Sequence, residues 1–140
     1  MKFKILIVAG NYYKKISDSL ILCAKEKLKN YSKVKYKSKV MKLNADVIEV
    51  PGAFEVPVII SKNINKYDGF IALGCIIKGQ TPHFDFISQS INNALMNISV
   101  NYKKPVGNGI ITCLNKKQAN ERCCKKGREA ANALISVLSK

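Results

Sequence analysis

Histidine is almost absent from this chain of 140 residues, in which only His83 occurs. The five cysteines form no Cys-x-x-Cys pair, so the chain lacks the ligand spacing that is typical of a zinc site. No apolar run approaches the roughly 20 residues that a membrane-spanning helix needs. The sequence therefore predicts neither a metal site nor a membrane protein.

Two further signals are missing near the amino terminus. Residues 1–8 place lysines before an apolar stretch, but this stretch ends at Gly10 without a small-residue cleavage site. We therefore expect a first β-strand rather than a secretory signal, and a cytoplasmic protein. Only one glycine follows this strand where a dinucleotide-binding loop needs three, so the segment implies no nicotinamide or flavin cofactor.

Acidic residues are scarce, since nine Asp and Glu stand against 24 Lys and Arg and leave a net charge of +15. Eight lysines fall between Lys25 and Lys42, and such a patch attracts nucleic acid or acidic membrane surfaces. The run has no arginine and few aromatic residues, so we expect no specific nucleic-acid binding. The favoured interpretation is a solvated face, with part of 33–40 forming an edge strand protected by its charge. Steering of an anionic substrate is a weaker alternative.

The cysteines are odd in number and have no paired spacing. Buried or half-buried thiols are the favoured interpretation for all five. The adjacent Cys123 and Cys124 have an alternative interpretation as a vicinal disulfide or a redox pair.

The apolar pattern predicts a regular alternation of strands and helices. Strands are expected at 3–9, 46–50, 70–77 and 106–113, and helices at 16–28, 54–64, 82–100, 116–124 and 128–138. We expect the third helix to carry Phe86, Ser90, Ala94 and Ile98 along one side, and the fourth strand to be broken at Gly107 and Gly109. Strands without polar alternation, separated by helices, indicate a parallel sheet that is covered on both faces. The prediction is an α/β fold in one domain over 1–140, a flavodoxin-like three-layer α/β/α sandwich with a four-stranded parallel sheet.

Three strand ends of such a sheet carry residues suited to chemistry, and ligands bind at this edge of open α/β sheets. Tyr12 and Tyr13 follow the first strand, Glu55 follows the second, and His83 follows the third at the predicted start of a helix, whose free amides favour an anion. Each has a structural alternative, as a sheet cap, a helix-start carboxylate or a helix-terminal residue. Together they favour acid–base chemistry on a planar heterocycle and a phosphorylated small molecule.

Three segments carry a more specific resemblance. They are VPGAFEVP at 50–57, ALGCIIKGQTPHFDF at 72–86, and QANER at 118–122 followed by Lys126 and Gly127. In this order they resemble the 6,7-dimethyl-8-ribityllumazine synthase family, and the similarity covers essentially the whole chain. The resemblance implies condensation of 5-amino-6-(D-ribitylamino)uracil with 3,4-dihydroxy-2-butanone 4-phosphate in riboflavin biosynthesis, with phosphate and water released and no metal or organic cofactor.

The resemblance also implies roles by position. Tyr12 would stack on the pyrimidine, and a ribityl-binding segment with a buried carboxylate would correspond to Ala53, Phe54 and Glu55. Backbone groups that read the pyrimidine edge would belong to Cys75, Ile76 and Ile77. The phosphate would be bound by Gln80, Thr81 and Arg122 beside Lys126, and His83 would move protons. We expect His83 and Arg122 to converge on the same bound anion.

Two departures from the family pattern concern assembly. Asn108 stands where the family often has an aromatic residue that reaches the neighbouring subunit's site, and we interpret it as a polar contact between subunits. The linker between Arg122 and Lys126 is short, as is the amino terminus. We expect a free homopentamer, with the family's sixty-subunit shell as the alternative. The alternatives in function are an archaeal-type riboflavin synthase and a non-catalytic lumazine- or flavin-binding paralogue.

Overall fold

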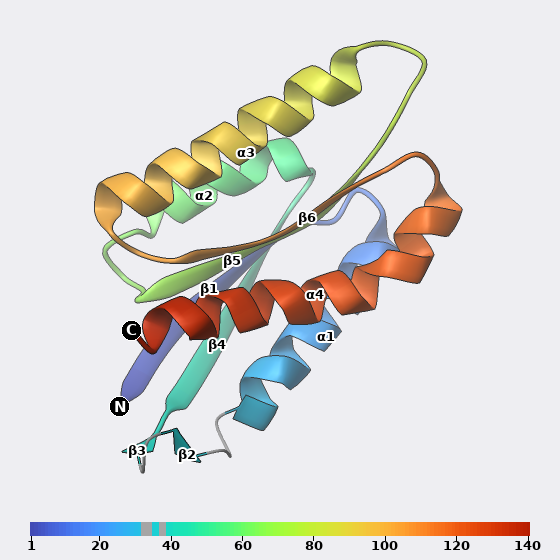
Figure 1. Ribbon diagram of the computed structural model, residues 1–140. Coiled ribbons are helices and arrows are strands. Elements are labelled where there is room, and N and C mark those ends of the chain that lie inside the picture. Colours follow the sequence, from blue (N-terminus) through green and yellow to red (C-terminus); the bar gives the residue numbers. More distant parts are fainter. Residues whose placement is uncertain (32–34, 37–38) are drawn as a thin grey trace.

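The computed structural model describes residues 1–31, 35–36 and 39–140 and has a four-stranded parallel sheet (Figure 1). Its strands are β1 (Lys2–Gly10), β4 (Lys42–Val50), β5 (Gly69–Ile77) and β6 (Val106–Cys113), in the order β4-β1-β5-β6. Every pairing in this sheet is parallel, and β1 lies between β4 and β5. The predicted four-stranded parallel sheet is therefore confirmed.

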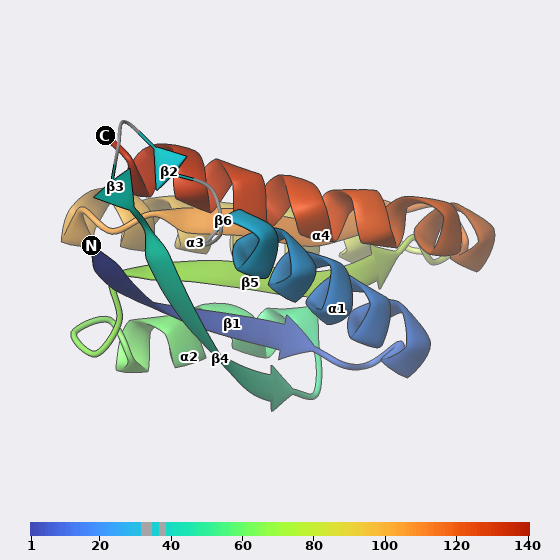
Figure 2. The same ribbon diagram turned by 90° about the horizontal axis from the view of Figure 1, so that it is seen from below.

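Helices cover both faces of this sheet. Figures 1 and 2 show α1 (Lys14–Tyr31) and α4 (Lys116–Leu138) on one face. The other face carries α2 (Val56–Lys62), preceded by a 3₁₀ turn at Ala53–Glu55, and α3 (His83–Tyr102). The result is the three-layer α/β/α sandwich that the sequence predicts.

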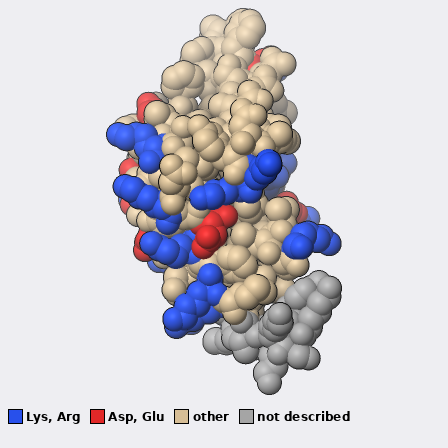
Figure 3. Space-filling model, turned by 90° about the vertical axis from the view of Figure 1, so that its left-hand side faces the viewer, with Lys and Arg blue, Asp and Glu red and all other residues tan. Residues whose placement is uncertain are grey.

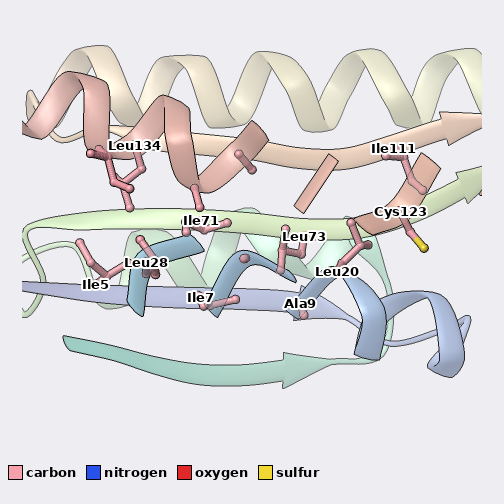
Figure 4. Packing of buried hydrophobic residues seen from close by; sticks show 14 of the residues in the cluster. Ile5, Ile7, Ala9, Leu20, Leu28, Ile71, Leu73, Ile111, Cys123 and Leu134 are labelled. Carbon is pink, nitrogen blue, oxygen red and sulfur yellow. The ribbon is translucent and has the colours of Figure 1, made fainter. Parts of the chain in front are cut away.

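The central strand explains why the strands lack polar alternation. Residues 5–9 of β1 are fully buried, because both faces of the sheet are covered. Ile5 and Ile7 point toward α1 and α4 and pack with Leu20 and Leu134 (Figure 4). Leu6 belongs to the second cluster, under α2 and α3. Each face therefore has its own apolar core.

Two predicted interruptions are wrong. The strand β6 runs without a break through Gly107 and Gly109, and α4 is one helix where two were expected. A Cβ built on Gly127 would lie 2.6 Å from the carbonyl oxygen of Leu20 in α1. This glycine therefore allows two helices to pack closely and does not end α4.

Other boundaries also differ from the prediction. The strand β4 begins four residues earlier than expected, since Lys42 already pairs with Lys2. The second helix is shorter than 54–64, because its first residues form the 3₁₀ turn. The buried residues of α3 are Ile91 and Leu95. Phe86, which was expected along one side with Ser90, Ala94 and Ile98, is 64% exposed.

The predicted edge strand at 33–40 falls partly outside the described residues. The described part forms the short strands β2 (Lys35–Tyr36) and β3 (Lys39–Val40), which pair antiparallel with each other and are separate from the main sheet. On the face at the left of Figure 1, Lys and Arg are spread over the surface with a few Asp and Glu among them (Figure 3). No described helix is long and apolar enough to cross a membrane.

The cysteines differ from the expected five thiols. Cys23 in α1 and Cys124 in α4 form a disulfide with their Cα atoms 5.3 Å apart. Cys75, Cys113 and Cys123 are free. The vicinal alternative is wrong as well, since Cys124 pairs with a residue 101 positions away instead of with Cys123.

Candidate functional site

A hollow of about 370 Å³ opens at the carboxyl ends of the central strands, and we call it the carboxyl-edge hollow. Its size lies within the range of small-molecule sites. Three strand ends and the start of α3 contribute its lining, which consists of Tyr12, Tyr13, Gly52, Ala53, Phe54, Cys75, Ile76, Ile77, His83 and Ile87. The structure thus brings together seven of the predicted site residues, namely Tyr12, Ala53, Phe54, Cys75, Ile76, Ile77 and His83.

Close backbone packing joins the first two strand ends. A Cβ built on Gly10 would lie 2.6 Å from the backbone nitrogen of Ala53, so only glycine fits at the end of β1. The backbone N–H of Asn11 donates to the carbonyl of Val50 at 2.8 Å. These contacts hold the loop after β1 against the loop after β4.

The tyrosines present an aromatic surface at this edge. Tyr12 is 77% exposed and meets Tyr13 edge-to-face, with ring centroids 4.9 Å apart. An exposed ring of this kind offers its face to a flat heterocycle. Burial raises the pKa of Tyr13, so its hydroxyl stays protonated at neutral pH.

His83 is the first residue of α3, and its side chain is exposed. Pro82 precedes it and supplies no side-chain cap, so the first amides of this 20-residue helix are not occupied by a capping side chain. Gln80 and Thr81 lie exposed in the loop just before this helix end. An imidazole therefore stands beside a helix amino terminus, where anions are favoured.

Glu55 does not match its implied environment within the single chain. The resemblance implies a buried carboxylate, but Glu55 is exposed at the end of the 3₁₀ turn. It also falls outside the lining of the carboxyl-edge hollow. Its place at the open edge of the sheet leaves its carboxylate in water.

Cys75 is half-buried and lines the hollow through the end of β5. Burial raises the pKa of the Cys75 thiol to about 12, and the thiols of Cys113 and Cys123 raise it further in the same direction. A thiol with this pKa stays protonated at neutral pH, so the side chain is a poor nucleophile.

The cationic residues lie in a different place. Arg122 and Lys126 line a hollow of about 180 Å³ on α4, together with Lys125 and Glu129. Arg122 Nη1 lies 3.9 Å from the sulfur of Cys113 at the end of β6. Because α4 and α3 cover opposite faces of the sheet, Arg122 and His83 do not line the same hollow (Figure 1). A single chain therefore does not place these two residues in one hollow, and their expected convergence on one anion stays a prediction.

Asn108 is separate from both groups. It lines a hollow between β6 and α3, and its side-chain amide donates to Asn92 Oδ1 at 2.8 Å. Its exposed position on an edge strand leaves it accessible from outside the chain.

A neighbouring hollow contains residues to which the sequence assigned no individual role. Lys14, Lys116 and Asn120 join the two tyrosines there. Lys116 Nζ lies 5.7 Å from the centroid of the Tyr13 ring. The contact joins segments about 100 positions apart in the chain, and no motif in either segment marks it.

Comparison with known proteins adds the following findings. The family model described as 6,7-dimethyl-8-ribityllumazine synthase matches residues 2–140. The 6,7-dimethyl-8-ribityllumazine synthase of Ruthia magnifica subsp. Calyptogena magnifica is 36% identical over 98% of this chain and 84% of its own length. The enzyme of the same name from Agrobacterium fabrum is 36% identical over 96% of this chain and 91% of its length. The enzyme of the same name from Bartonella bacilliformis is 38% identical over 96% of this chain and 88% of its own length.

Proposed function

The chain belongs to the 6,7-dimethyl-8-ribityllumazine synthase family, and we propose that it carries out the reaction of this family at the carboxyl-edge hollow. It is a transferase of riboflavin biosynthesis, which condenses 5-amino-6-(D-ribitylamino)uracil with 3,4-dihydroxy-2-butanone 4-phosphate to 6,7-dimethyl-8-ribityllumazine, releasing phosphate and water. One observation supports this location of the active site. The carboxyl-edge hollow brings together an aromatic pair, three backbone segments and the only histidine of the sequence.

In this proposal the pyrimidine substrate lies against the aromatic surface. Tyr12 stacks on its ring, and Ala53, Phe54 and Glu55 bind the ribityl chain. Backbone groups of Cys75, Ile76 and Ile77 read the polar edge of the ring. The protonated thiol of Cys75 supports a backbone role, because it takes no part as a nucleophile.

His83 moves the protons of the reaction. The substrate amine attacks the ketone to form an imine, phosphate leaves by elimination, and the second ring closes with loss of water. Each step transfers a proton, and an imidazole both donates and accepts protons near neutral pH. The exposed position of His83 at the rim of the hollow leaves it within reach of both substrates.

We propose that the phosphate is bound across two copies of the chain. Gln80 and Thr81 offer a helix amino terminus on one copy, and the cationic group Arg122 and Lys126 comes from the other. The support is geometric, because one chain holds its guanidinium and its imidazole on helices of opposite sheet faces. Arg122 suits a phosphate because its planar fork donates two parallel hydrogen bonds.

The same proposal requires a homo-oligomer, and we favour a homopentamer over the sixty-subunit shell. Exposed apolar residues on α3 support an assembly, since Phe86, Met96 and Val100 are each 64% exposed. Asn108, exposed on the edge strand β6, is then a polar contact to the neighbouring copy. A chain that is kept monomeric should be inactive.

A cytoplasmic location is also part of the proposal. Three free thiols within the described part of the chain are typical of a reducing compartment. The disulfide between Cys23 and Cys124 needs a separate explanation.

The direct test mixes the purified protein with both substrates and follows lumazine absorbance together with phosphate release. The expected result is equal amounts of the two products. Riboflavin formed from lumazine alone, without phosphate, would contradict the proposal, as would binding of lumazine without turnover.

A mixing experiment tests the site across two copies. His83→Ala and Arg122→Ala each damage a different half, so mixed assemblies contain some sites with both residues intact. Random mixing of equal amounts restores about a quarter of the sites. No gain in activity over the separate variants, once mass spectrometry has shown that subunits exchange, would place Arg122 outside the shared site.

A further inference from the structure

The disulfide Cys23–Cys124 joins the middle of α1 to the first half of α4. The two cysteines are 101 positions apart in the chain, so the bond closes a long loop. Cys23 is buried, with 5% of its surface exposed, and Cys124 is partly exposed. Disulfides are rare in reducing compartments, where they are usually transient. A partly exposed sulfur is open to exchange with small thiols and disulfides.

The two helices are held together by more than this bond. Gly127 brings α4 close to the Leu20 carbonyl, and Cys123 Sγ lies 3.3 Å from Ser19 Oγ of α1. Leu20 and Ala24 are fully buried in the same contact. Since these contacts do not involve the sulfur–sulfur bond, reduction leaves the two thiols adjacent and the bond can form again.

The bond lies on the same stretch of α4 as the cationic residues of the proposed phosphate site, but on the opposite side of the helix, because Cys124 faces α1. Arg122, Lys125 and Lys126 surround Cys124 in sequence and line one hollow. The net charge of +15 attracts small anionic thiol compounds such as glutathione to the protein surface. The clamp therefore holds the part of α4 that presents the cations, and a small anionic disulfide can approach it.

We propose that Cys23 and Cys124 form a reversible thiol–disulfide pair that responds to a small disulfide of the glutathione type and clamps the Arg122-bearing half of α4 to α1. One thiolate attacks the small disulfide and releases one small thiol. The second thiolate then attacks the mixed disulfide, forms the Cys23–Cys124 bond and releases the second small thiol. Two protein thiols are oxidised and one small disulfide is reduced to two thiols.

The other cysteines are poor partners for this exchange. Cys123 is buried and its thiol donates to the Asn120 carbonyl at 3.4 Å, on a different side of α4 from its neighbour. Cys113 is buried against Arg122, and the pKa of Cys75 is raised to about 12. The exchange is thus confined to one pair among the five cysteines.

The test equilibrates the full chain in glutathione buffers from reducing to oxidising and traps free thiols with N-ethylmaleimide. Oxidation is expected to lower the mass of the protein by two hydrogen atoms, and peptide mapping should then find the peptides that contain Cys23 and Cys124 linked. The oxidised protein should melt roughly 5–15 °C higher than the reduced protein, because the bond closes a long loop. Amides at 116–126 should exchange hydrogen faster in the reduced protein.

Two matched variants separate the bond from its neighbour. Cys124→Ser should abolish the dependence of the melting temperature on reductant, whereas Cys123→Ser should keep it. A linked pair other than Cys23 and Cys124, or equal melting of reduced and oxidised wild type, would overturn the proposal. None of these measurements uses the enzymatic reaction, so their outcome is independent of whether the proposed function is correct.

Discussion

Gly127 of α4 packs directly on the backbone of Leu20 in α1, so a Cβ at position 127 would lie 2.6 Å from the Leu20 carbonyl oxygen. Gly127→Ala should therefore destabilise the protein. Alanine gains up to about 1 kcal/mol in helix propensity, but the clash is with backbone and forces the helices apart. Overpacking of this kind costs about 1–3 kcal/mol, which lowers the melting temperature by roughly 3–12 °C.

Lys125→Ala is the control for this substitution. Its side chain is exposed on the same helix, and its pair with Glu129 is a surface contact at 4.0 Å. Such a change stays within about 0.5 kcal/mol of wild type. If the Gly127→Ala protein is as stable as this control, the two helices can move apart without loss of stability, and the prediction is wrong.

Asn115 caps α4 and should contribute measurably to stability. Its side-chain oxygen accepts from the Gln118 N–H at 2.9 Å, and Gln118 in turn accepts from the Leu114 N–H at 2.8 Å. Asn115→Ala should lower the free energy of unfolding by about 1 kcal/mol in urea titrations, since it leaves a helix amide without its partner. Asn115→Ser should restore most of the loss, because serine also caps. Equal losses in both variants would argue against the cap.

His83→Ala should slow turnover without abolishing it. General acid–base help by one side chain is typically worth ~10²–10⁴-fold, and the positioning of two substrates remains. Steady-state rates with both substrates measure the effect, and the assembly state serves as the control for folding. An unchanged kcat would remove His83 from the proposed mechanism.

Arg122→Ala should mainly raise the KM for the phosphate-bearing substrate, by about 10–100-fold, because charge-assisted hydrogen bonds contribute roughly 1.5–3 kcal/mol. The KM for the pyrimidine substrate should change much less. Arg128→Ala removes the same charge from an exposed position further along α4. The two variants should differ clearly, and equal KM values would mean that only net charge matters.

Cys75 should resist alkylation in the folded protein. A pKa of about 12 leaves a thiolate fraction at pH 8 that is about 10³-fold smaller than for an ordinary thiol. Reactivity should rise with pH through the range below 12, since only the deprotonated form reacts. Peptide mapping after iodoacetamide treatment measures the rate, with urea-unfolded protein as the reference. Rapid labelling at pH 7 in the folded state would contradict the buried environment.

The strands β1, β5 and β6 were predictable to within one residue at each end, because buried strands leave a simple apolar signal. Residues 5–9 form an unbroken apolar run for this reason, and β6 matches its predicted bounds of 106–113. The glycines were misread, because glycine indicates a break in a single sequence but also allows close packing between elements. Gly127 serves the second purpose, and its partner Leu20 is more than 100 positions away.

The candidate site was predictable at the strand ends and not beyond them. The rule that ligands bind at the carboxyl edge of a parallel sheet brought His83, Tyr12 and Cys75 into one group. It does not say which face each following helix covers, so the separation of Arg122 from His83 was missed. The disulfide was missed for a similar reason, since pairing of Cys23 with Cys124 depends on helix packing and not on spacing.

The position of β1 between β4 and β5 has a consequence during synthesis. The strand β1 leaves the ribosome before both of its neighbours, and the second of them, β5, begins only at Gly69. At roughly 5–20 residues per second, the nascent apolar segment waits several seconds for its partners. Newly made chains should therefore need chaperone protection at β1 until the region around Ile77 has emerged.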